Sequence, residues 1–178
     1  MKRLFMTAGL TAAFLLVVVT ASAQNANFAG TWSLDKAKSQ GLSQRDQGAD
    51  KVTLTITQDA TTIALDRKVE GGQPPQGGGG GMGGGGGRGP AGPQSFNLDG
   101  KEVSSEMTFG QNTGTRTTKA TLSGGTLELL TKIAAGDRNS TTTQKLSLSA
   151  DGKTLTVVTH REGGQQPIPD STAVYTKS

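Results

Sequence analysis

Cysteine is absent from this sequence of 178 residues, and histidine occurs once. Without cysteine the chain can form neither a disulfide nor a lipoprotein-type thioether anchor, so its stability must come from packing alone. Aromatic residues are scarce, with a single tryptophan and a single tyrosine. The net charge of +4 is spread without blocks, whereas nucleic-acid binding needs a basic stripe or patch. The composition therefore excludes a disulfide scaffold and argues against nucleic acid as a partner.

Recognisable catalytic motifs are equally scarce. His160 is the only histidine, and on a strand it would share a face only with Glu162. Such a pair is more typical of a solvated sheet edge than of a metal site. No Gly-x-Ser-x-Gly elbow and no cysteine nucleophile occur. The sequence therefore predicts no catalytic residue, no metal site and no cofactor, and a protein that is not an enzyme.

The first 23 residues have the pattern of a secretory signal peptide. Lys2 and Arg3 precede an apolar run over 4–20, and the small residues after it form a cleavage site that ends at Ala23. The mature chain would then start at Gln24. The alternative is an uncleaved membrane anchor, although threonine and glycine interrupt a run that is already short for a span. We therefore expect export in a bacterium, to the periplasm or the extracellular space.

The mature chain, 24–178, has the length of one domain, and residues 71–93 interrupt it. This segment is almost entirely glycine and proline, with hardly any side chain to bury, so folding cannot offset its loss of conformational entropy. It carries neither a phosphate-binding Gly-x-x-x-x-Gly-Lys pattern nor repeated arginines. We predict a disordered loop inserted between two paired strands of one domain, since the cost of closing a loop grows only slowly with its length.

Elsewhere apolar and polar residues alternate with a period of two, which is the pattern of half-buried strands. Val52, Leu54 and Ile56, for example, alternate with threonines. Turn signals separate the runs, among them Asp99-Gly100 and Gly124-Gly125, which suit tight hairpin turns. The pattern predicts about ten strands, at 30–34, 52–57, 63–69, 96–98, 103–109, 116–122, 127–133, 141–148, 155–161 and 172–177.

A meander of so many strands with one apolar face must close or fold over to hide that face and its edges. The short sequential turns favour an all-β fold, a single antiparallel up-and-down β-barrel of about 8–10 strands. The alternative is a β-sandwich, which would need Greek-key crossovers. An outer-membrane barrel would carry apolar residues and aromatic girdles on its outer face, where this sequence has Thr, Lys and Gln. No stable membrane insertion is therefore expected after cleavage.

Short motifs near both ends resemble the calycin superfamily. Phe28-Ala29-Gly30-Thr31-Trp32-Ser33-Leu34 resembles the first strand of lipocalins, fatty-acid-binding proteins and avidins. Val174-Tyr175-Thr176-Lys177 resembles the last strand of fatty-acid-binding proteins. The Gly-x-Trp start and Leu148-Ser-Ala-Asp-Gly-Lys-Thr-Leu155 also resemble uncharacterised exported lipocalin-like proteins of bacteria. The resemblance implies that Gly30 and Trp32 close one end of the barrel, with Trp32 packed beneath a lysine or arginine stem.

The family's ligand sites carry over only in part. In fatty-acid-binding proteins an arginine two residues before the last-strand tyrosine holds the ligand carboxylate, and here that position is Ala173. Tyr175 alone remains as a ligand-contact candidate from that motif. An avidin-like biotin site would need several tryptophans, and this chain has one.

Strand alternation adds three candidate ligand-binding residues. Arg67, Arg116 and Arg161 each fall on the inward parity of their strands. A planar guanidinium binds carboxylate or phosphate through two parallel hydrogen bonds. Each arginine also lies near a strand end, where a bulge would shift the parity and a long side chain could reach water. Both interpretations stay open at this point.

Taken together, these features predict an exported, monomeric, lipocalin-like barrel that binds or carries a small hydrophobic or anionic amphipathic molecule. A non-catalytic structural or interaction protein of the cell envelope, with its barrel filled by side chains, is the alternative. A hydrolase or isomerase built inside the barrel is a third possibility. Strand number distinguishes the ligand carrier from the side-chain-filled barrel. The inward residues are mostly Leu, Val and Ile, which leave room for a cavity in a ten-stranded barrel and little room in an eight-stranded one.

Overall fold

The computed structural model describes residues 26–71, 93–109, 112–136, 138–163 and 168–178. The expected signal peptide with its cleavage site, and the predicted disordered loop apart from Gly71 and Pro93, lie outside the described residues. No helix among the described residues is long and apolar enough to cross a membrane.

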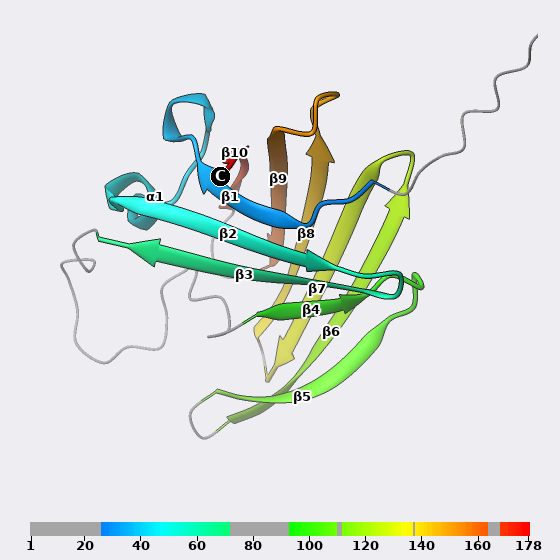
Figure 1. The fold of residues 1–178 in the computed structure, drawn as a ribbon. Coiled ribbons are helices and arrows are strands. Elements are labelled where there is room, and N and C mark those ends of the chain that lie inside the picture. The colour runs from blue at the N-terminus through cyan, green and yellow to red at the C-terminus, as the bar shows by residue number, and fades with distance from the viewer. Residues whose placement is uncertain (1–25, 72–92, 110–111, 137, 164–167) are drawn as a thin grey trace, which may run out of the picture.

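Ten antiparallel strands form one sheet that curls into a nearly closed barrel (Figure 1). The spatial order is β4-β3-β2-β1-β10-β9-β8-β7-β6-β5, so neighbours in the sheet are neighbours in the chain except at the β1–β10 pair. This confirms the up-and-down barrel with ten strands, rather than a sandwich. The strands are β1 (Gly30–Leu34), β2 (Lys51–Gln58), β3 (Thr62–Glu70), β4 (Gln94–Asn97), β5 (Val103–Phe109), β6 (Asn112–Ser123), β7 (Thr126–Ala135), β8 (Arg138–Leu148), β9 (Thr154–Gly163) and β10 (Ile168–Lys177).

One predicted hairpin is wrong. Asp99-Gly100 does form a turn, with Gly100 at a φ of +74°, but the two strands that it joins are not paired. β4 pairs with β3, and β5 pairs with β6. The Asp99 carboxylate accepts a hydrogen bond from the Lys101 N–H at 3.0 Å, so the turn is closed locally by a side chain and not by a strand ladder. β4 and β5 are therefore the two edges of the sheet.

The other expected turns are confirmed. Asp59 closes the β2–β3 hairpin by accepting hydrogen bonds from the N–H groups of Thr61 and Thr62, both at 2.7 Å. The Thr62 hydroxyl and these backbone donors lower the pKa of Asp59 by stabilising its charged form. β3 and β4 pair across the glycine-rich insertion, with Leu65 opposite Gln94. The strands that flank the insertion in the chain are therefore paired with each other.

Two short helices between β1 and β2 were not predicted. They are η1 (Lys36–Lys38) and α1 (Gln44–Gly48). α1 begins at Ser43, whose hydroxyl accepts a hydrogen bond from the Asp46 N–H at 3.2 Å. Both helices lie at one end of the barrel (Figure 1), which we call the helix end. The opposite end holds the β2–β3, β6–β7 and β8–β9 turns and is called the turn end.

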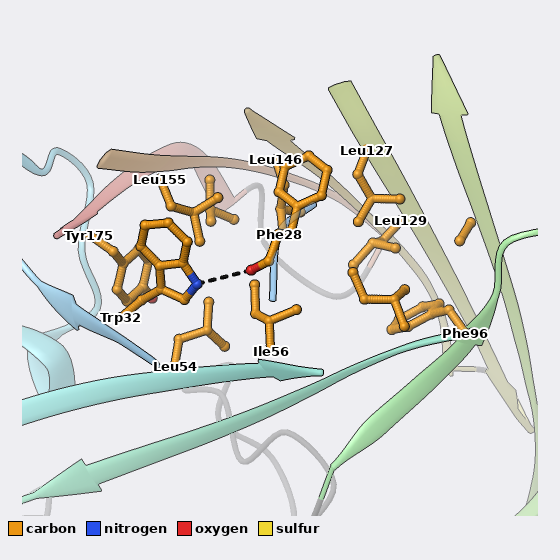
Figure 2. Packing of buried hydrophobic residues seen from close by; sticks show 13 residues of the cluster. Phe28, Trp32, Leu54, Ile56, Phe96, Leu127, Leu129, Leu146, Leu155 and Tyr175 are labelled. Atoms are coloured by element: carbon orange, nitrogen blue, oxygen red, sulfur yellow. Dashed lines mark hydrogen bonds between the residues drawn. The ribbon is translucent and has the colours of Figure 1, made fainter. Parts of the chain in front are cut away.

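The apolar core fills the half of the barrel near the turn end. Figure 2 shows its side chains converging from strands all around the sheet. They include the pair Leu146 and Val157, which face each other on β8 and β9. The buried cluster consists of Phe28, Trp32, Leu54, Ile56, Ile63, Phe96, Ala120, Leu127, Leu129, Leu146, Leu155, Val157 and Tyr175.

Candidate ligand-binding site

On β6–β9 the inward-facing side chains change from apolar to polar about halfway along the strands. Opposite residues of an antiparallel pair lie on the same face of the sheet, so the register identifies the inward set. On β8 and β9 the buried Leu146–Val157 pair is followed by Gln144–Thr159 and then by Thr142–Arg161. On β6 and β7, Ala120–Leu129 is followed by Thr118–Thr131 and then by Arg116–Ile133. On β6–β9 the interior is therefore apolar toward the turn end and polar, with arginines, toward the helix end, whereas on β2 and β3 the inward Val52–Val69 pair keeps it apolar.

Arg67 lies on the inward face of β3, on the same side as Ile63 and Leu65. Its guanidinium forms an ion pair with the carboxylate of Asp46 on α1, and its side chain is 35% exposed. It also lies against the hydroxyl of Tyr175, a residue that is only 4% exposed. Burial works to lower the pKa of Arg67, but Asp46 and Tyr175 together outweigh it and the pKa is raised. The structure therefore brings together two of the four ligand-binding candidates, Arg67 and Tyr175.

Arg116 is a different kind of cation. Its Nε atom is buried, and within the described residues it has no hydrogen-bond partner. Burial lowers its pKa, since a desolvated guanidinium is less stable in its charged form. Among the residues that the structure describes, no carboxylate pairs with this inward cation, whereas Arg67 pairs with Asp46.

Arg161 lies opposite Thr142 of β8 and Ile168 of β10. The β9–β10 register shifts between Ile168 and Ser171, so a bulge does occur beside this arginine. Its side chain is exposed. The three arginines come from β3, β6 and β9, which are not neighbours in the sheet, but all three lie toward the helix end. Their role in ligand binding stays a prediction.

Trp32 lies in the apolar core beneath a lysine side chain. It is fully buried, and its Nε1 donates a hydrogen bond to the Phe28 carbonyl oxygen at 3.1 Å (Figure 2). Lys177 Nζ lies 5.3 Å from the ring centroid, within the range of a cation–π contact. A Cβ atom at Gly30 would lie 3.1 Å from Lys177 Cε. Glycine at that position therefore leaves room for the lysine stem over the indole.

His160 lies on the outer face of β9 and has two acidic partners. The predicted partner Glu162 has its Oε1 3.2 Å from Nε2, and Asp170 of β10 has its Oδ1 2.6 Å from Nδ1. The sequence did not predict Asp170, because the bulge in β10 decides which side chain reaches the histidine. Among the described residues no group of three or more His, Asp or Glu could hold a metal ion.

These contacts make a pH prediction. The carboxylates of Asp170 and, to a smaller extent, Glu162 accept hydrogen bonds from the ring and raise the pKa of His160 above 6.5. Protonated His160 therefore stabilises the folded state fully at a pH below the ordinary histidine pKa. This contribution to folding stability is lost as the pH rises through the raised pKa of the folded state. NMR titration of the single histidine should give a midpoint above 6.5, and Asp170→Asn should lower it more than Glu162→Gln does. A midpoint unmoved by Asp170→Asn would contradict the geometry.

Two hollows lie mainly outside the barrel interior. The larger, of about 490 Å³, lies over β6–β9 and is lined mainly by outward-facing polar residues, among them Thr117, Lys132, Thr141 and Glu162. The register places these four side chains in one row across the four strands. The smaller, of about 260 Å³, lies beside η1 and α1.

The comparisons with known proteins concern the chain path. The chain path is that of a ten-stranded antiparallel up-and-down barrel. No protein-family model and no curated protein sequence matches the chain. Among solved structures, fatty-acid-binding protein 1 of Echinococcus granulosus is similar over 84% of this chain and 96% of its own, with 14% identity and a TM-score of 0.47. The fatty-acid-binding protein of Manduca sexta is similar over 84% and 99%, with 18% identity and a TM-score of 0.45. Because these identities and scores are low, what the barrel binds has to be inferred from its own residues.

Asp46 is the residue of this site that the sequence analysis missed. It belongs to the stretch between β1 and β2, to which no element was assigned. Ser43-Gln44-Arg45-Asp46 has the Ser-x-x-Asp spacing of a helix start, and that signal could have located α1. Nothing in the sequence indicates that α1 would lie against Arg67, because that contact depends on how the barrel closes.

Proposed function

We propose that this protein binds a small amphipathic molecule inside the barrel. The apolar part of the ligand would lie against the buried cluster of the turn half, and an anionic group would lie among the arginines of the helix half. The observation that carries this proposal is the change of the inward face from leucine and valine to threonine, glutamine and arginine within single strands. A ligand with one apolar and one anionic end matches that change.

Two further observations support the proposal. Arg116 presents an inward cation with a buried, unpartnered Nε among the described residues, and a buried polar group without a partner is costly. A ligand anion would supply one. The inward side chains Thr118, Thr131 and Gln144 are half-buried, so solvent reaches the interior beyond the apolar cluster. From the signal-peptide pattern of residues 1–23 we propose, in addition, that binding takes place outside the cytoplasm. We also propose that the mature chain is a monomer.

Titration of the delipidated chain 24–178 with dodecanoate and with dodecanol tests the proposal. Trp32 is the only tryptophan and belongs to the cluster against which the apolar tail would pack, so its fluorescence reports binding, and calorimetry gives an independent affinity. The combined change Arg67→Gln and Arg116→Gln should weaken dodecanoate binding by about tenfold or more, since a hydrogen bond to a charged group contributes about 1.5–3 kcal/mol. Dodecanol binding should change little.

Lys68→Gln with Lys119→Gln is the matched control. Lys68 follows Arg67 on β3, and Lys119 precedes Ala120 on β6, so both lysines face outward. The control double variant therefore removes the same amount of positive charge from the outer face. Equal weakening by both double variants would show that only the net charge matters. Failure of both ligands to bind the unaltered chain would reject a ligand-binding interior of this kind.

The envelope interaction protein remains the second candidate, and one observation favours it. Both hollows described above lie mainly outside the barrel interior, and the larger is lined mostly by polar residues, with the inward-facing Ile133 and Ser140 at its margin. A barrel that bound neither amphiphile, and that carried no small molecule when purified from its own compartment, would favour this candidate. Native mass spectrometry of the purified mature chain distinguishes the two.

A further inference from the structure

Polar contacts attach the α1 helix to the barrel, together with the buried Ala49 that follows it. None of its five residues is buried. Lys36 Nζ donates hydrogen bonds to the carbonyl oxygens of Gln47, at 3.2 Å, and of Ala49. The contact that reaches the barrel interior is the ion pair of Asp46 with Arg67. A helix without a buried apolar face depends on such contacts for its position.

The Asp46 carboxylate occupies a place on the inward face of the barrel. Its side chain is only 16% exposed, although α1 lies at the end of the barrel and not in the sheet. Arg67 is an inward residue of β3, and the buried Tyr175 lies against it. A carboxylate bound here has a guanidinium and, close by, a phenolic hydroxyl that can donate a hydrogen bond. The chain thus carries its own carboxylate at an anion site.

We propose that Asp46 is an internal competitor for this anion site, so that an anionic ligand must displace it from Arg67 and thereby release α1 from the barrel. This inference rests on the proposed function. Two carboxylates at one guanidinium repel each other, and the repulsion is stronger where water is partly excluded. Asp46 therefore lowers the affinity of the site for anionic ligands and leaves neutral ligands unaffected. Ligand charge, rather than ligand length, then controls whether α1 stays in place.

Asp46→Asn tests the proposal, because it removes the charge and keeps the shape of the side chain. The Ser43 hydroxyl bonds to the backbone N–H of residue 46, so the start of α1 is unaffected. Dodecanoate should bind the variant about fivefold more tightly than the unaltered chain, which corresponds to the upper range for a partly exposed ion pair. Dodecanol should bind both proteins equally. Asp50→Asn, an exposed acid just after α1, is the matched control and should leave both affinities unchanged.

Amide hydrogen exchange supplies a second measurement that does not depend on the variant. In the unaltered chain, saturating dodecanoate should speed exchange over 44–48, and dodecanol should not. Unchanged dodecanoate affinity in Asp46→Asn, equal tightening in Asp50→Asn, or slower exchange of α1 with dodecanoate would each overturn the competition while leaving the binding function intact. Absence of binding by both ligands would overturn the proposed function, and this inference with it.

Discussion

Replacing Trp32 by alanine should lower the free energy of unfolding by about 3–5 kcal/mol, the range for large aromatic truncations in cores. The side chain is fully buried within the cluster. Its loss removes the hydrogen bond to the Phe28 carbonyl, the contact with Lys177 and a large apolar area. Urea unfolding of the mature chain, followed by far-ultraviolet circular dichroism, measures the effect.

Trp32→Phe is the matched control for this prediction. It keeps an aromatic ring under Lys177 but removes the indole N–H, so it should cost clearly less than the alanine change. A loss below about 1 kcal/mol for Trp32→Ala would be typical of a surface position. The idea that this residue closes the barrel would then have to be abandoned.

Replacing Phe96 by alanine should also cost about 3–5 kcal/mol, and it should loosen β4 in particular. β4 has only four residues and pairs with a single strand. Phe96 is 2% exposed and lies opposite the buried Ile63. An edge strand this short has few ladder hydrogen bonds, so the buried ring supplies most of what holds it to the core. Amide hydrogen exchange should accelerate over 94–97 more than over β8.

Ser95→Ala is the control on the same strand. Ser95 is exposed, and surface changes of this kind usually shift stability by less than about 0.5 kcal/mol. Uniformly faster exchange across the whole barrel in Phe96→Ala, with no excess in β4, would contradict the anchoring role.

The sequence predicted the strands best where the interior is apolar. Val52, Leu54 and Ile56 alternate with threonine, and the structure buries all three. Toward the helix end of β6–β9 the same alternation loses its signal, because the inward residues there are mostly polar. β6 therefore begins at Asn112, and β8 at Arg138, earlier than the apolar pattern indicates. Strand length was underestimated for the same physical reason that makes the interior amphipathic.

The candidate site was predictable only in part. Period-two alternation predicted inward positions for Arg67 and Arg116, and the register agrees, with Leu54 opposite Arg67 and Ile133 opposite Arg116. The partners of these residues were not predictable. Asp46 reaches Arg67 from a helix 21 residues earlier in the chain, and no carboxylate within the described ranges pairs with Arg116, which only the folded chain reveals. Sequence alternation assigns a residue to a face, whereas only the folded chain brings partners together across the barrel.

The unpaired edges of β4 and β5 divide the protein into two meanders. β1–β4 and β5–β10 are each built only from contacts between consecutive strands, and among the described strands the two units share one hydrogen-bonded seam, between β1 and β10. That seam has few residue pairs, from Trp32 opposite Lys177 to Leu34 opposite Tyr175. It is also the pairing with the greatest sequence separation, which makes it the slowest kind of contact to form during folding. A chain cut at the Asp99-Gly100 turn would keep every other strand pair within one fragment, so reassembly of the two fragments would depend on this seam and on the core between them.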